Sequence, residues 1–226
     1  EKWNNNIAIL SGDTLLIEVY NHFLEGKYEN LALILKVFNQ TAIQVCEGQQ
    51  LDMNFETRQD VTIEEYINMI RLKTSVLVGG AFKIGALVAN AKESESDLIY
   101  EFGVNLGIAF QLQDDYLDCF GDPEKFGKQV GGDIISNKKT FMMLKALEID
   151  STGELQDRIS KKVFNSEEKV ESVKSLYKKL HVDTLAFDLM NEYYSKAIDS
   201  LHQIESLEDA KNKIIRFAED LMKRSS

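Results

Sequence analysis

The sequence predicts an all-α protein. Only one of its 226 residues is proline, and 13 are glycine. Long segments rich in Leu, Ile, Ala, Lys and Glu carry apolar residues at helical spacing, which is typical of helices rather than strands. The length suits one large domain, and a hydrophobic content of 44% is sufficient for a sizeable core.

Composition also limits the class of protein. The net charge of −11 disfavours nucleic acid or an anionic membrane as the main partner. The two cysteines, Cys46 and Cys119, have no C-x-x-C spacing, so a disulfide framework or a zinc site is not expected. No apolar run reaches membrane-spanning length, and no signal-peptide pattern opens the chain. We therefore expect a soluble, cytoplasmic protein.

Helix boundaries can be assigned in the first part of the chain. Helical apolar spacing runs from Ile7 to Glu25, with an interruption at residues 11–13, and Gly26 ends it. A second long helix is expected over residues 30–51, followed by a polar, turn-like stretch over residues 54–60.

Thr62 and Glu65 have the spacing of a capping box, which predicts a short helix from there to about Leu72. Lys73 and Thr74 lie at the junction with a strongly apolar helix over residues 75–91. That helix is rich in glycine and alanine, a composition that permits close helix approach or leaves room for a ligand. Ser94 or Ser96 is expected to cap the next helix, which ends near Cys119.

Residues 120–132 hold four glycines and the proline, which predicts the most mobile loop of the chain. Further amphipathic helices follow, and they have the character of a scaffold. We expect them over residues 137–147, 153–164, 166–180, 182–204 and 207–223.

The stretch F-Q-L-Q-D-D-Y-L-D, residues 110–118, ends the mostly apolar helix in three carboxylates. Asp114 and Asp118 are four residues apart and share a helix face, and Asp115 lies beside them. Like charges at this spacing repel one another, and a hard divalent cation such as Mg²⁺ removes the conflict. The alternative interpretation is a solvated acidic helix end.

Further candidate residues flank the acidic helix. Each one alone has an ordinary structural interpretation, since lysines are usually solvated and glycine pairs usually form turns. Together they form a coherent set: Gly48, Gln49, Asp52, Lys73, Thr74, Lys128, Gly131, Gly132, Asp133, Lys138, Lys139 and Thr140.

With these motifs the chain resembles the trans-isoprenyl diphosphate synthases, the polyprenyl synthetase family. Within that family it is most similar to the short-chain farnesyl or geranylgeranyl diphosphate synthase type. The resemblance rests on D-D-Y-L-D, on residues 126–128, on Gly132-Asp133 with Lys138, on Lys73-Thr74, and on Gly48-Gln49-x-x-Asp52. It covers nearly the whole chain, residues 1–226, as one domain. It implies an isoprenoid-synthase helical bundle with a central cavity, a homodimer, and no stable membrane insertion.

The resemblance also implies an activity, a Mg²⁺-dependent head-to-tail condensation with Mn²⁺ as an alternative metal. Isopentenyl diphosphate and an allylic diphosphate (dimethylallyl, geranyl or farnesyl) would give a longer prenyl diphosphate. Asp114, Asp115 and Asp118 correspond to the second aspartate-rich motif, with Asp114 as the direct metal ligand and the others partly acting through waters.

Roles for the remaining residues follow from the same resemblance. The lysines that would contact the allylic diphosphate are Lys73, Lys128 and Lys138. Thr74 and Gln111 would present oxygens to the developing cation. Asp133 would support the metal shell, and the residues that would line or brace the cavity are Gln49, Asp52 and Phe110. For Phe110, plain core packing is an equally good interpretation.

One departure from the family is clear. The family's first aspartate-rich motif and its paired arginines lie upstream of Glu1, and no second D-D-x-x-D occurs in the chain. The isopentenyl diphosphate site is expected in that upstream part, so we expect the chain to be an N-terminally incomplete synthase. The alternatives are a class I terpene cyclase, a catalytically silent regulatory subunit, and a helical scaffold with a fortuitous acidic helix.

Overall fold

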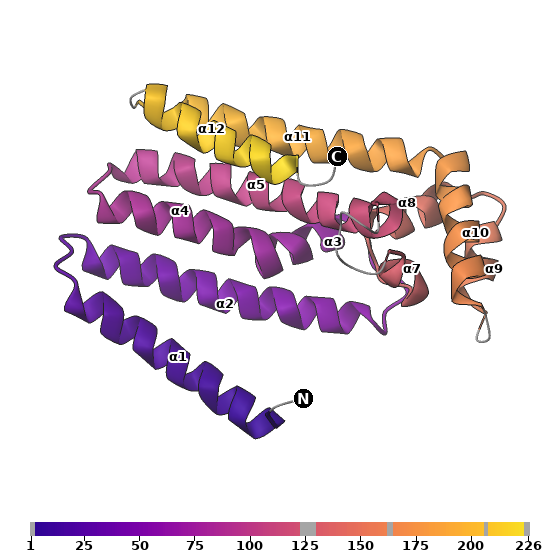
Figure 1. The fold of residues 1–226 in the computed structure, drawn as a ribbon, viewed down its shortest axis with the longest axis horizontal. Helices are drawn as coiled ribbons and strands as arrows, with labels where there is room; N and C mark the ends of the chain where they lie inside the picture. The colour runs from indigo at the N-terminus through magenta and orange to yellow at the C-terminus, as the bar shows by residue number, and fades with distance from the viewer. Residues whose placement is uncertain (1–2, 123–129, 162–164, 206–207, 224–226) are drawn as a thin grey trace.

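The structure, a computed structural model, describes residues 3–122, 130–161, 165–205 and 208–223. These residues form helices and no strands, so the predicted fold class is confirmed. The long helices run side by side along the longest axis, and short helices gather at one end (Figure 1). In chain order they are α1 (Asn5–Glu25), α2 (Leu31–Phe55), α3 (Ile63–Ile70), a π-helical turn η1 (Arg71–Ser75), α4 (Val76–Val88), α5 (Glu93–Phe120), α7 (Gly132–Ile135), α8 (Phe141–Ile149), α9 (Glu154–Ile159), α10 (Ser166–Lys179), α11 (Val182–His202) and α12 (Glu208–Met222). Within the described ranges, no helix combines the length and apolarity needed to cross a membrane.

The clearest predicted boundary is confirmed at α3. The Glu65 N–H donates to the Thr62 hydroxyl over 3.1 Å, and the Thr62 N–H donates to the Glu65 carboxylate over 2.9 Å. Both bonds of the capping box are therefore present, and they satisfy donors that a helix start leaves without intrahelical partners.

One predicted interruption and one predicted N-cap are wrong. Helix α1 continues through residues 11–13, where the Ser11 hydroxyl donates back to the Ile7 carbonyl over 2.7 Å. Helix α5 begins at Glu93 with Lys92 at the N-cap, rather than at Ser94 or Ser96. Ser96 is buried instead and donates to the Glu93 carbonyl over 2.7 Å, so its hydroxyl bonds inside the first turn.

The segment after the acidic helix also differs from expectation. Helix α7 was not predicted, and α8 begins at Phe141 rather than at residue 137. Asn137 has a left-handed backbone (φ 55°), and the Thr140 hydroxyl caps α8 by accepting from the Met143 N–H over 3.3 Å. The predicted loop over residues 120–132 lies largely outside the described residues.

Helix α5 is the centre of the molecule, between α4 and α11 (Figure 1). Its Phe102, Leu106 and Ala109 are fully buried. A Cβ atom added to Gly103 would lie 2.7 Å from the Cα of Gly79, so the two helix backbones touch through their glycines. The small-residue composition of residues 75–91 thus serves close helix packing, which brings the residues of α5 next to those of η1.

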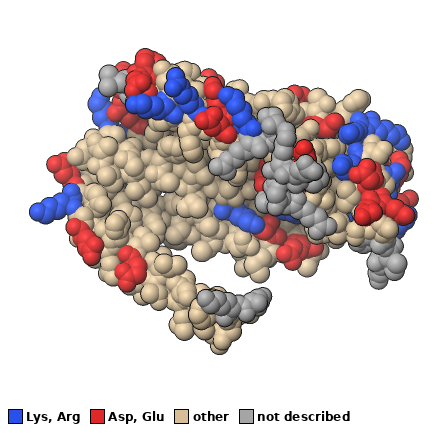
Figure 2. All heavy atoms as spheres, viewed as in Figure 1, with Lys and Arg blue, Asp and Glu red and all other residues tan. Residues whose placement is uncertain are grey.

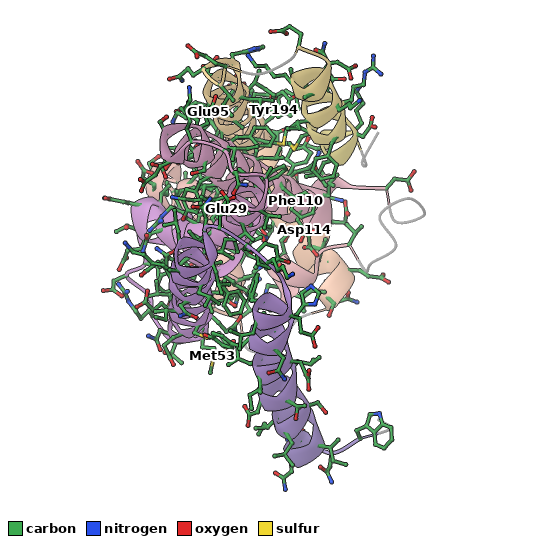
Figure 3. All side chains as sticks on the ribbon, turned by 90° about the vertical axis from the view of Figure 1, so that its left-hand side faces the viewer. Glu29, Met53, Glu95, Phe110, Asp114 and Tyr194 are labelled. Carbon is green, nitrogen blue, oxygen red and sulfur yellow. The ribbon has the colours of Figure 1, made fainter. Side chains whose placement is uncertain are left out.

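Helix α1 has no buried residue and extends away from the bundle (Figures 1 and 3). Its last turns are attached to α2 through aromatic contacts, among them Tyr20 edge-on to Phe38 at 5.5 Å between ring centroids. Toward its N-terminal end the apolar side chains are exposed, for example Leu10 at 64%.

Candidate active site

The predicted acidic residues lie on the last turns of α5, and helix geometry separates them. Asp114 lies on the same side of the helix as Phe110, one turn away (Figure 3). Asp118 follows one turn later, and its carboxylate accepts the Asp133 N–H over 3.0 Å. Asp114, Asp118 and Phe110 are all half-buried. The helix thus presents two carboxylates along one stripe.

Asp115 faces the interior and is 3% exposed. Its Oδ2 accepts the hydroxyl of Tyr66 over 2.5 Å. Its Oδ1 accepts the Gln111 amide over 3.2 Å and faces the Lys138 ammonium at 3.4 Å. Burial raises the pKa of Asp115, while Lys138 and the hydrogen bonds act in the opposite direction. In this arrangement Asp115 connects α3, α5 and the segment before α8.

Lys138 is shared between two carboxylates. Its Nζ lies 3.2 Å from Asp133 as well as 3.4 Å from Asp115. Burial lowers the pKa of Lys138, but the two carboxylates outweigh this and raise the pKa above its ordinary value. Burial raises the pKa of Asp133 to about 6, because Asp115 and Asp118 add to the effect of burial while Lys138 opposes it. The lysine therefore remains cationic in a cluster of acidic side chains.

Lys73 and Thr74 project from the π-helical turn η1 rather than from a helix junction. The Lys73 ammonium lies 2.6 Å from the Asp52 carboxylate of α2. The Thr74 hydroxyl donates to the Gln111 carbonyl oxygen over 3.2 Å. π-helical turns are rare and often occur at functional sites, because the extra residue shifts the direction of the side chains that follow.

Gly48 brings α2 against this turn. A Cβ atom at position 48 would lie 2.2 Å from the Lys73 backbone nitrogen, a distance that real Cβ contacts essentially never show. Only glycine allows this approach, and the approach sets Asp52, one turn further along α2, beside Lys73.

A pocket of about 330 Å³ connects these elements. It lies between the end of α2, α3 and the segment before α8, and its lining residues are Asp52, Phe55, Glu56, Met69, Ser136, Asn137, Lys138 and Lys139. Asp52 and Lys138 therefore line the same pocket. Figure 2 shows basic and acidic side chains close together beside a broad, mostly uncharged face.

The structure brings most predicted residues together, but not all of them. One network includes Thr74, Gln111, Asp115, Asp118, Asp133 and Lys138, and a second, neighbouring pair joins Lys73 to Asp52. Gln49 is exposed on α2. Lys139 contributes to the pocket wall and approaches the Asn137 carbonyl at 3.5 Å. Lys128 lies outside the described residues.

Tyr66 belongs to the network and was not predicted. In the sequence it is one residue of the apolar stripe of α3, with Met69 and Ile70, and that pattern indicates core. The one available signal was chemical: a tyrosine at a core position needs a partner for its hydroxyl.

The predicted set of three metal ligands is not assembled in this arrangement. Across the described ranges, no three His, Cys, Asp or Glu side chains converge on a point suited to a metal ion. The physical reason is that Asp115 is turned inward to Tyr66, Gln111 and Lys138. Asp114 and Asp118 fit a hard cation by their oxygen chemistry and shared stripe, so the metal ligands remain a prediction.

The all-helical fold and the site, in which the acidic helix α5 contacts Lys138 through Asp115, define a class, the all-α terpenoid synthases. A family model for polyprenyl synthetase matches residues 1–180, and the chain belongs to this family. It is 36% identical to the geranylgeranyl diphosphate synthase of Sulfolobus acidocaldarius over 96% of this chain and 67% of that protein. It is 34% identical to a short chain isoprenyl diphosphate synthase of Methanothermobacter thermautotrophicus over 98% of this chain and 68% of that protein.

Solved structures agree with this assignment. A crystal structure of a geranylgeranyl pyrophosphate synthase superimposes with a TM-score of 0.93 at 44% identity, covering all of this chain and 71% of that one. A geranylgeranyl pyrophosphate synthetase from Pyrococcus horikoshii gives a TM-score of 0.89 at 31% identity, covering 97% of this chain and 68% of that one. The chain thus spans roughly two thirds of the length of these relatives.

Proposed function

We propose that this protein is a prenyltransferase of isoprenoid biosynthesis, which condenses isopentenyl diphosphate with an allylic diphosphate to form a longer prenyl diphosphate. One observation carries the proposal. In a chain of the polyprenyl synthetase family, Lys138 lines a pocket and lies next to Asp115 of a D-D-x-x-D helix, and Lys73 is paired with Asp52, which lines the same pocket. That combination suits a substrate whose diphosphate must be neutralised before it can leave.

The first step is ionisation of the allylic substrate. The bond between the allylic carbon and the diphosphate oxygen breaks, and the diphosphate keeps the electron pair. At about 4 Å and an effective dielectric constant near 20, each cationic contact with the departing group is worth about 4 kcal/mol. Lys73 and Lys138 supply such contacts from fixed positions, since Asp52 and Asp133 hold them in place.

Asp114 and Asp118 are the residues that would hold Mg²⁺, or Mn²⁺ in its place. When bound there, the metal supplies further positive charge for the diphosphate oxygens. Asp133 is well situated to support this arrangement through its N–H bond to Asp118. Asp115 is bonded to protein donors, so we assign it an indirect role, which agrees with a carboxylate that reaches the metal only through water.

The second step forms the new carbon–carbon bond. The double bond of isopentenyl diphosphate attacks the allylic cation, and the cation that results then loses a proton to the released diphosphate, which restores a double bond. Between these events the cation needs oxygen dipoles and no reactive nucleophile. Thr74 and Gln111 supply the oxygen atoms, and the ring of Phe110, one turn before Asp114 on α5, supplies an apolar wall.

A homodimer is part of this proposal, with α1 as the contact surface. Leu15 and Leu24 on this helix are 66% and 67% exposed, and large exposed apolar patches mark association sites. A second copy is the partner to which we assign this face. Light scattering coupled to size-exclusion chromatography should give twice the protomer mass, and Leu15→Lys should shift the protein towards the monomer.

We also propose a cytoplasmic location. The two thiols lie on separate helices, α2 and α5, and both are free. Unpaired cysteines are usual in proteins of a reducing compartment. Fluorescence microscopy of the tagged protein tests this directly.

A product assay tests the function. The full-length gene product receives isopentenyl diphosphate, an allylic diphosphate and Mg²⁺, and mass spectrometry identifies the product. We expect one discrete elongated prenyl diphosphate, absent in Asp114→Ala and unaffected in Asp188→Ala, a control at an exposed aspartate of α11.

Two other results would contradict the proposal. A hydrocarbon formed from a single allylic diphosphate indicates a cyclase. Turnover that appears only after addition of a second protein indicates a regulatory subunit.

A further inference from the structure

Tyr66 has a buried hydroxyl, and its hydrogen bond to Asp115 has a fixed donor and a fixed acceptor. The side chain is 1% exposed and lies in the core between α3 and α5. Its hydroxyl proton goes to Asp115 over 2.5 Å. A carboxylate accepts hydrogen bonds and does not donate them. The Tyr66 hydroxyl must therefore be the donor in this bond, with its proton pointing towards Asp115.

The same rule fixes the next residue in the chain of hydrogen bonds. Because Asp115 only accepts, the Gln111 side chain must present its NH₂ group to it, at 3.2 Å. The carbonyl end of the Gln111 amide then faces Thr74, whose hydroxyl donates to it over 3.2 Å. The amide cannot flip without breaking both bonds.

The Thr74 hydroxyl is the end of this chain. A hydroxyl has one proton and two lone pairs. Since the proton is committed to Gln111, what remains on the Thr74 oxygen is negative charge density. A hydroxyl turned the other way would present its proton and repel a carbocation.

We propose, building on the prenyl transfer proposed above, that Tyr66 is a positioning residue for this reaction. Through Asp115 and Gln111 it sets the direction of the Thr74 hydroxyl, so that lone pairs rather than a proton face the allylic cation. Tyr66 touches neither substrate in this arrangement. Its contribution appears when the cation forms, and it should therefore affect turnover more than substrate binding.

Tyr66→Phe removes the hydroxyl and keeps the ring, and Tyr177→Phe is the matched control. Tyr177 is also 1% exposed, and its hydroxyl contacts the Met143 sulfur at 3.7 Å rather than the network. In the full-length protein with Mg²⁺, we expect Tyr66→Phe to lower kcat by about 10- to 100-fold, as is typical for residues that orient functional groups. The KM for the allylic diphosphate should stay within about twofold of wild type in both variants, and kcat of Tyr177→Phe should do the same.

A double-mutant cycle with Thr74→Val separates positioning from general structural damage. In the Thr74→Val background there is no hydroxyl to orient, so adding Tyr66→Phe should cause little further loss of kcat. Gln111→Leu, which removes the middle of the chain, should lower kcat less in the Thr74→Val background than in the wild type, because only the contribution of its own oxygen is then lost. This second pair tests the proposal even if Tyr66→Phe folds poorly.

Several results would overturn the inference. Equal losses of kcat in Tyr66→Phe and Tyr177→Phe would indicate a merely structural role, and a rise in KM alone would indicate a role in binding. Additive losses in the cycle would show that Tyr66 does not act through Thr74. An active wild type with a fully active Tyr66→Phe overturns this inference alone, whereas a wild type without turnover overturns the proposed function and this inference with it.

Discussion

Replacing Gly48 by alanine should separate α2 from the π-helical turn that carries Lys73 and Thr74. The added Cβ would lie 2.2 Å from the Lys73 nitrogen and 2.6 Å from the Leu72 carbonyl carbon. Ordinary van der Waals contact begins at 3.4 Å, so the two backbones must move apart by about 1 Å. Both atoms belong to the main chain, and no flexible side chain can absorb the shift.

The magnitude follows from this displacement. Overpacking of this kind typically costs about 1 to 3 kcal/mol of unfolding free energy, and the better helix propensity of alanine offsets up to about 1 kcal/mol. The effect on catalysis should be larger than the effect on stability. Misplacing a positioned group by about 1 Å can reduce the rate by about 100-fold, and both Lys73 and Thr74 would move.

The assay combines thermal unfolding with steady-state kinetics on Gly48→Ala and on the control Gly85→Ala. Gly85 also lies within a helix, but nothing is within 4 Å of its added Cβ. Gly85→Ala should therefore stabilise the protein by about 0.5 to 1 kcal/mol, with kcat unchanged. If both variants behaved alike, the close approach of α2 would not be what positions Lys73 and Thr74.

Three further predictions concern the buried polar groups. Because burial raises the pKa of Asp133 from 3.8 to about 6, its protonation should contribute up to about 3 kcal/mol of stability to the metal-free protein as pH falls from above 6 to below 4. Asp133→Asn lacks this contribution, so the difference in unfolding free energy between wild type and variant, measured with urea, should change by that amount over this pH range. Burial also raises the pKa of the Cys119 thiol to about 12, so iodoacetamide at pH 8 should modify only the exposed Cys46 of the folded protein. Mass spectrometry should then show one adduct on the folded protein and two in denaturant. A second adduct on the folded protein would contradict this. Lys169→Met should lower the unfolding free energy by about 1 to 3 kcal/mol, since it leaves the half-buried acceptors Ile135 O and Asn137 Oδ1, now bonded at 3.0 and 2.8 Å, without this donor. An unchanged urea midpoint would refute this prediction.

Local chemistry explains which helix boundaries could be predicted. The capping box at Thr62 and the end of α1 before Gly26 depend on residues adjacent in the sequence, and the structure has both. The start of α8 was misplaced because Asn137 to Thr140 have acceptable helix propensities on their own. Their conformation depends on partners elsewhere, since the buried Lys169 of α10 binds the Asn137 side chain.

The candidate site shows the same division. The spacing of Asp114 and Asp118 was sufficient to expect them on one face of a helix. Asp115 was grouped with them because sequence spacing does not show which way the third carboxylate turns. That direction is set by Tyr66, 49 residues away, whose position in an apolar stripe gives no indication of its polar contact. The π-helical turn likewise has no sequence pattern that predicts it.

The π-helical turn has a geometric consequence for the whole bundle. Each residue of an α-helix advances by about 100°, so one extra residue rotates the face of α4 by that angle relative to the face of α3. The continuous helical segment formed by α3, η1 and α4 can therefore pack against two neighbours in different directions: α3 packs against α8, and α4 packs against α5. Deleting a single residue from η1 would restore ordinary helical phase and turn Gly79 of α4 away from α5. The π-helical turn η1 should therefore tolerate a change of length less well than the connections before α3 and after α4, even though regular helix continues on both sides of it.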